Sequence, residues 1–240
     1  MKGKVLLFIM VFGLITSACS TQIIKLVTLE DKDFYKGREI VTKVDDNTRI
    51  SVEIDNYTGD EVVFYVQIEN KSGEKIFIQP RDFYVDAVEK DLVSYDEHFR
   101  RFYALDPERQ IKKINEDMED RKTAHAVVTG LNATFALVSV VADLTDNDSE
   151  NDAHQVSRDI AVWADNQVNE EIDYDAAMNE YDSQKEFWKN EVLRITDLYQ
   201  NDAVGGLIFV PINKEIKYLK FTVPLDSGIY TFLYKQVVVE

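Results

Sequence analysis

The sequence of 240 residues holds a single cysteine, Cys19, so no intramolecular disulfide can form and the fold must be stabilised by its hydrophobic core. Its three histidines, His98, His125 and His154, do not have the H-x-x-x-H spacing of a metal site. The chain also lacks the C-x-x-C, G-x-S-x-G and glycine-rich phosphate-binding patterns. We therefore expect no cofactor, no bound metal and no enzymatic activity.

Basic residues are scarce as well. The chain has 27 Lys and Arg against 44 Asp and Glu, which gives a formal net charge of -17. A strongly acidic surface opposes binding to nucleic acid and adhesion to anionic lipid. We therefore expect no nucleic-acid partner. We also expect the net negative charge to keep the domain in solution.

The first 18 residues have the composition of a secretory signal. Lys2 and Lys4 precede an apolar run over residues 5–15, which is shorter than the roughly 20 residues that span a bilayer. The small residues 16–18 follow this run and lead directly to Cys19. A basic head, a short apolar core and a small-residue site predict a signal peptide that is removed by cleavage.

The segment Ser17-Ala18-Cys19 resembles the lipobox of bacterial lipoproteins, in which a small residue precedes an invariant cysteine. Thr16 stands where that family usually has leucine. The resemblance implies that residues 1–18 are cleaved off and that Cys19 is diacylated on sulfur and acylated on nitrogen. Stable anchoring takes two or more acyl chains, which agrees with this modification.

Ordinary secretion is the alternative, because Thr16 and Ala18 also form a small-x-small cleavage site. That route would leave an unpaired thiol at the new N-terminus. If Cys19 is acylated, the resemblance implies a membrane partner, and Ser20 after the cysteine implies the outer membrane where a cell has two.

Residues 61–69 contain the clearest strand pattern of the chain. Val62, Phe64, Val66 and Ile68 alternate with more polar residues, which predicts a half-buried strand. Other β segments are expected at 38–44, 49–54, 76–78, 206–211, 215–223 and 229–239. We expect the early strands to share one core with the late apolar residues Leu207, Phe209, Phe221, Tyr230 and Phe232.

The middle of the chain predicts three helices. Asp106-Pro107 has the residue types that begin a helix, and Asp152 and Asp173 are expected to cap a second and a third. Residues 125–144 are nearly free of charge, so we expect them to be buried by the other two helices; a self-associating or membrane-inserting face is the alternative. The covering residues would be Val156, Ile160 and Trp163 on the second helix, and Tyr181, Trp188 and Val192 on the third.

The acidic segment 143–152 is expected to be a solvated loop between helices. Oxygen-rich loops can bind calcium, but the EF-hand pattern that begins at Asp146 fails at Asn151 and at Ser157.

These elements predict an α+β fold, in which an antiparallel immunoglobulin-like β-sandwich of about seven strands carries a three-helix insertion between its halves. The expected divisions are 1–18 for the signal peptide, 19–104 for the first half, 105–200 for the insertion and 201–240 for the second half. The segments FYVQIENKSGEKIFIQPRDF (64–83) and EFWKNEVLRITDLYQNDAVGGLIFVP (186–211) are similar to uncharacterised lipoproteins of Bacteroidota-type bacteria, in which helices split such a sandwich. The resemblance implies that Phe187 and Trp188 are packing anchors and that Gly205-Gly206 begins a strand.

The expected function is a binding or structural module of the bacterial cell envelope, with an envelope protein or glycan as partner. Loops on a rigid scaffold are common binding sites. The predicted contact surface is the seam between sandwich and insertion, at Phe99, Arg100, Arg101, Phe102, Tyr103, Leu198 and Tyr199. The alternative is an envelope hydrolase that uses a carboxylate pair in the same cleft.

Overall fold

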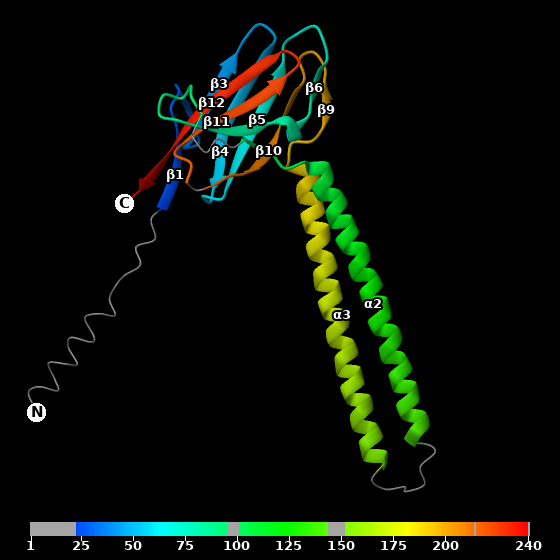
Figure 1. Ribbon diagram of the computed structural model, residues 1–240. Coiled ribbons are helices and arrows are strands. Elements are labelled where there is room, and N and C mark those ends of the chain that lie inside the picture. The colour runs from blue at the N-terminus through cyan, green and yellow to red at the C-terminus, as the bar shows by residue number, and fades with distance from the viewer. Residues whose placement is uncertain (1–22, 96–100, 144–151, 214, 240) are drawn as a thin grey trace, which may run out of the picture.

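The structure is a computed structural model that describes residues 23–95, 101–143, 152–213 and 215–239. A body of β-strands lies at one end, and a long pair of helices projects from it (Figure 1). The chain is thus α+β, with sheets that are mostly antiparallel.

Among the described residues, the body contains two five-stranded sheets and one small sheet. The first sheet has the order β1 (Ile23–Thr28), β12 (Gly228–Val239), β11 (Tyr218–Leu225), β7 (Tyr84–Val88) and β8 (Arg101–Tyr103). The second has the order β10 (Ala203–Pro211), β5 (Glu61–Asn70), β4 (Thr48–Tyr57), β3 (Arg38–Val44) and β2 (Asp33–Tyr35). The small sheet pairs β6 (Ile76–Ile78) with β9 (Thr196–Leu198), and the 3-10 helix η1 (Pro80–Asp82) follows β6.

The two large sheets face each other across the core. Val62, Phe64, Val66 and Ile68 of β5 are all fully buried, as their alternation predicts. Phe64 stacks on Phe221 of the opposite sheet, with ring centroids 4.1 Å apart and planes 13° from parallel. Early and late strands therefore share one core, and its late members include Phe221, Tyr230 and Phe232 as expected.

The expected orientation of β10 is wrong by one residue. Its core residues are Ile208 and Val210, whereas Leu207 and Phe209 are only partly buried. Phe209 packs against Phe187 and Trp188, with ring centroids 5.9 and 5.2 Å away. The expectation that Phe187 and Trp188 are packing anchors is thus confirmed.

Within the described residues, the insertion contains two helices and not three. α2 (Pro107–Asp143) begins as expected, because the Asp106 carboxylate accepts the backbone N–H of Glu108 at 3.0 Å. α3 (Asp152–Asn190) then runs without a break through Asp173. The segment 152–190 has neither glycine nor proline, so nothing in it stops the helix at Asp173.

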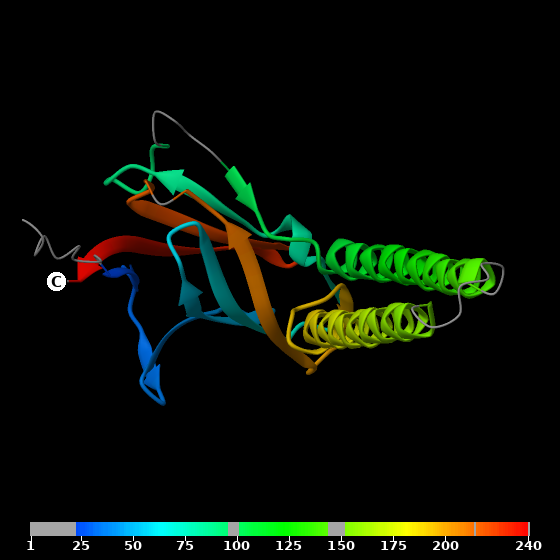
Figure 2. The same cartoon turned by 90° about the horizontal axis from the view of Figure 1, so that it is seen from below.

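α2 and α3 lie side by side as an antiparallel hairpin (Figure 1, Figure 2), which we call the arm. His125 of α2 stacks on Tyr174 of α3 at 4.0 Å between ring centroids, and Arg121 forms an ion pair with Glu170 at 3.4 Å. Polar and aromatic contacts therefore join the two helices at this level.

The expectation that two helices cover residues 125–144 is wrong, because α2 has only one helical neighbour in the described chain. Val127 remains 55% exposed on α2, and Val168 and Ile172 are similarly exposed on α3. No helix among the described residues is long and apolar enough to cross a membrane.

Polar contacts at the root of the arm involve the start of α2 and the segment that follows α3. The Arg194 guanidinium donates two hydrogen bonds, of 2.9 and 2.8 Å, to the Glu108 carboxylate at the start of α2. The backbone N–H of Leu193 bonds to the carbonyl of Leu207, and the N–H of Leu207 bonds to the carbonyl of Glu191. The chain leaving α3 therefore runs directly against β10.

Gly206 lies where this exit segment touches β10. A Cβ atom at position 206 would be 2.5 Å from the backbone nitrogen of Leu193 and 2.8 Å from its Cα. A main-chain neighbour cannot rotate away as a side chain can, so this contact requires glycine.

We predict that Gly206→Ala lowers the free energy of unfolding by about 3 kcal/mol, because the root must separate from β10 to admit the methyl group. Urea unfolding would measure the change. Gly73→Ala is the matched control, since a Cβ there meets nothing within 4 Å, and it should change stability by less than about 0.5 kcal/mol. Equal stability of the two variants would contradict the tight contact at the root.

Candidate ligand pocket

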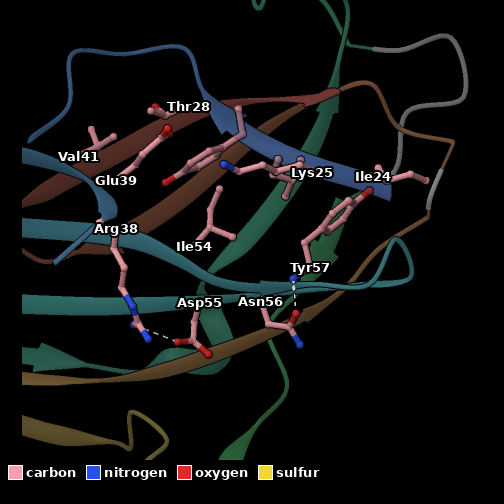
Figure 3. A pocket seen from close by; sticks show the side chains of 13 residues that line it. Ile24, Lys25, Thr28, Arg38, Glu39, Val41, Ile54, Asp55, Asn56 and Tyr57 are labelled. Carbon is pink, nitrogen blue, oxygen red and sulfur yellow. Dashed lines mark hydrogen bonds and ion pairs between the residues drawn. The ribbon is translucent and has the colours of Figure 1, made fainter. Parts of the chain in front are cut away.

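A pocket of about 300 Å³ opens between the edge strand β1 of the first sheet and strands β3 and β4 of the second. In Figure 3, Ile24, Lys25 and Thr28 lie on the β1 side, and Ile54 to Tyr57 lie on the β4 side. The pocket therefore forms where the two facing sheets separate at one edge.

The inner wall of the pocket is apolar. Leu26 and Val41 belong to the buried core, and Ile54 packs against that core from β4. Polar side chains, among them Lys25, Arg38 and Asp55, line the rest of the pocket. This combination of an apolar wall with a few polar groups is typical of small-molecule sites.

Tyr234 of β12 also lines the pocket, and its side chain is 2% exposed. Its hydroxyl is closed to solvent and has no hydrogen-bond partner among the described residues. Burial, with a smaller contribution from Glu30, raises the pKa of this phenol well above its usual value. The hydroxyl is therefore a neutral O–H group that can donate a hydrogen bond but does not.

Ion pairs occupy most charged groups of the pocket. Arg38 contacts Glu53 at 2.7 Å and Asp55 at 3.2 Å, and these partners raise the pKa of its guanidinium. Glu39 forms an ion pair with Lys32 at 2.7 Å. Lys25 is exposed, and no carboxylate of the described chain lies within ion-pair distance of its ammonium group. Among the described residues that line it, the pocket thus offers one cation without an ion-pair partner, Lys25, whereas the Tyr234 hydroxyl is closed to solvent.

The predicted contact surface is divided by the structure. Cys19, Phe99 and Arg100 lie outside the described residues. Arg101, Phe102 and Tyr103 form the edge strand β8 of the first sheet, whereas Leu198 belongs to β9 of the small sheet. Tyr103 and Tyr199 are exposed, but Leu198 is buried and is not available for contact.

Arg101 has a structural role within the body. Its guanidinium donates to both oxygens of Asp86, at 2.8 and 3.2 Å, and lies 3.8 Å from the centre of the Tyr84 ring. Asp86 is only 1% exposed, so Arg101 neutralises a buried carboxylate. Arg101 therefore pairs with a strand of the body and not with the helices of the arm.

The structure describes no metal site at the residues that it covers: no three His, Cys, Asp or Glu side chains there group closely enough to hold an ion. The sequence analysis considers the acidic segment 143–152 as a calcium-binding loop. Residues 144–151 of this segment lie outside the described residues. Of the carboxylates in the pocket, Glu39 and Asp55 are ion-paired.

Sequence reasoning missed the pocket. Its signal would have been the alternation of Ile24 and Leu26 with Lys25, which is typical of a half-buried edge strand. No sequence pattern distinguishes Tyr234 from other tyrosines. Its unusual feature is a buried hydroxyl without a hydrogen-bond partner among the described residues, which only the structure shows.

No protein-family model, curated protein or solved structure matches this chain. The similarity to lipoproteins therefore stays a prediction from the sequence, and the site has to be interpreted from its own chemistry.

We predict that Tyr234→Phe raises the free energy of unfolding by about 1 kcal/mol, because it removes a buried hydroxyl that has no partner. Thermal or urea unfolding would measure the change. Tyr57→Phe is the matched control: the Tyr57 hydroxyl donates to Gln236 at 3.0 Å, so this variant should lose about 1 kcal/mol. A loss of stability in both variants would show that Tyr234 has a partner.

We also predict that Arg101→Met lowers the free energy of unfolding by about 3 kcal/mol, because it leaves the buried Asp86 carboxylate without its bidentate partner. Arg109→Met, on the exposed surface of α2, is the control and should change stability by less than about 0.5 kcal/mol. If Arg101→Met were as stable as this control, Arg101 would be free to serve as a contact residue.

Proposed function

We propose that this protein is a lipid-anchored binding module of the bacterial cell envelope, and that the pocket between β1, β3 and β4 is its ligand site. The observation that carries the proposal is the pocket itself, which has an apolar inner wall and an exposed lysine, Lys25, that has no ion-pair partner among the described residues. An apolar wall with a few polar groups beside it is typical of small-molecule sites.

The proposed anchor is acylated Cys19, in the outer membrane where the cell has one. Four peptide steps separate Cys19 from Ile23, the first residue of β1, and they reach at most about 14 Å. Because Ile24, Lys25 and Leu26 line the pocket, an anchored protein would hold its pocket close to the membrane surface.

We further propose that the two facing sheets are an immunoglobulin-like sandwich with the arm inserted between its halves. The antiparallel pairing of β10 with β5, and of β11 with both β7 and β12, supports this interpretation. A rigid sandwich holds an edge pocket in a constant shape, which suits binding.

Binding is favoured over the hydrolase alternative by the state of the carboxylates in the pocket. Asp55 bonds to Arg38 and Glu39 bonds to Lys32, so neither is a free acid or base beside the apolar wall. Tyr103 and Tyr199 remain candidate contacts for an envelope protein or glycan, because both are exposed.

We predict that Cys19→Ala moves the protein from the membrane pellet to the soluble fraction after a salt wash. The acyl chains would be the main membrane attachment, and alanine cannot carry them. Cell fractionation with an immunoblot measures this, and metabolic labelling with an alkyne fatty acid should mark the native chain but not the variant. Ser20→Ala is the control and should remain labelled and pelleted. A Cys19→Ala protein that still pellets would contradict the anchor.

A further inference from the structure

We infer that β1 pairs along its open edge with an extended segment of a partner protein, which adds a strand to the five-stranded first sheet and places apolar side chains in the pocket. This inference names the partner class for the site of the proposed function and rests on it.

The backbone of β1 has hydrogen-bonding groups that point away from the body. Among the described strands β1 pairs only with β12, in an antiparallel register. The N–H of Leu29 bonds to the carbonyl of Leu233 in continuation of that register, and such bonds recur at every second residue. The residues between them therefore direct their N–H and C=O groups toward the open edge. These residues are Ile24, Leu26 and Thr28.

The side chains of the same three residues line the pocket. Leu26 is buried there, whereas Lys25, on the other face of β1, is exposed. A strand paired with Ile24, Leu26 and Thr28 would lie about 5 Å from β1, which is the ordinary spacing of neighbouring strands. Every second side chain of that strand would then point toward the apolar wall of the pocket.

The second sheet extends past β1 and leaves apolar surface uncovered. Glu39 of β3 lies on the same face as the buried Val41, and Phe34 of β2 is directly opposite Glu39. Phe34 therefore belongs to the core-facing side of its sheet, but it is 68% exposed, since the first sheet ends at β1 within the described chain. In Figure 2 the blue hairpin that contains β2 and β3 extends away from the red strand β12. A strand added to β1 would cover this surface.

Open backbone groups next to an apolar pocket select an extended peptide as the occupant, because main-chain bonds supply affinity and alternate side chains fill the pocket. A small molecule would fill the pocket but would leave the edge of β1 unpaired.

A second copy of this chain does not fit the same edge. Two β1 strands would pair about a two-fold axis perpendicular to the sheet, which places both second sheets on the same side. The hairpin of β2 and β3 in each copy would then occupy the space beneath the other copy's β1. A single peptide strand has no second layer and avoids this clash.

The probe is the peptide acetyl-TVEVTV-amide, whose valines alternate with polar residues and whose glutamate would lie on the same face as Lys25. The protein would be residues 20–240, which contain every residue that the structure describes. Two-dimensional NMR titration reports the dissociation constant and the residues that shift, and we expect the largest shifts on β1, β2 and β3. The shuffled peptide acetyl-VVTETV-amide, which has the same composition without the alternation, should bind at least about tenfold more weakly.

Two N-methylated forms of the probe test the backbone bonds. One is methylated on the nitrogens of its valines and the other on those of its remaining residues, so each form blocks one edge of the peptide. In antiparallel pairing the valine N–H groups face β1, and in parallel pairing the others do. We expect one form to lose at least about tenfold in affinity and the other to bind as the parent does.

Variants of the protein test the same edge. Ile24→Pro removes an N–H that faces the open edge and leaves the bonds to β12 intact, and Ile24→Ala is its control because it keeps that N–H. The proline variant should bind the probe at least about tenfold more weakly than the alanine variant. Phe34→Ala should weaken the probe several-fold, whereas Phe77→Ala, on β6 of the small sheet, should not. Unfolding midpoints would show that all four variants are folded.

Equal affinity of both N-methylated forms, or equal affinity of Ile24→Pro and Ile24→Ala, would overturn strand pairing at β1. Cyclohexanol tests the pocket separately, through shifts at Leu26, Val41 and Ile54. Binding of cyclohexanol without binding of the peptide would overturn this inference and leave the pocket as a small-molecule site. Binding of neither probe would count against the proposed ligand site as well. The Cys19→Ala fractionation tests the anchor independently of these titrations.

Discussion

Both large sheets depend on the two ends of the arm lying side by side. β5 gains its outer neighbour β10 only after the chain has passed through α2 and α3, and β7 gains β11 in the same way. The contact of Arg194 with Glu108 brings the exit of α3 to the entry of α2. At Gly206 the absence of a side chain lets the exit segment lie directly on β10. The body closes around its core because these contacts place the late strands beside the early ones.

The sequence predicts those parts of the fold in which a repeated pattern is long enough to be read. β5 alternates from Phe64 to Ile68, and Asp106-Pro107 marks the beginning of α2. By contrast, β2, β8 and β9 have three residues each, which is too short for a period of two to be seen. β6 is equally short, and it was predicted from the turn residues 70–73 that precede it. The third helix was predicted because Asp173 has the residue type of a cap, although no breaking residue precedes it. The β10 error has a similar origin, since Gly205 and Gly206 carry no side chain from which a buried face could be read.

The candidate site was less accessible to sequence reasoning than the fold. The pocket is assembled from segments around residues 24–28, 37–41, 54–57 and 234, whose proximity follows from strand order and not from local pattern. Clusters of aromatic and arginine residues in the sequence pointed to residues 99–103. Within that cluster, Arg101 turns toward a buried partner, Asp86, which the sequence places 15 positions earlier. The residue type of Arg101 therefore indicated a possible contact with a partner molecule. Only the structure shows that its guanidinium is already hydrogen-bonded to Asp86.

Because the arm is long, a small rotation at its root produces a large displacement at its far end. α2 has 37 residues, so it extends about 55 Å from its root. Over that length a rotation of about one degree at the root displaces the far end by about 1 Å. A displacement of that size is enough to lengthen a hydrogen bond beyond its normal donor–acceptor distance. The angle at which the arm leaves the body is set at its root, by the Arg194–Glu108 pair, by the backbone against Gly206 and by the packing of Phe187 and Trp188 on Phe209. A force applied to the far end of the arm would be concentrated on this joint, next to β10, and transmitted from there into the sheet that also forms one wall of the pocket.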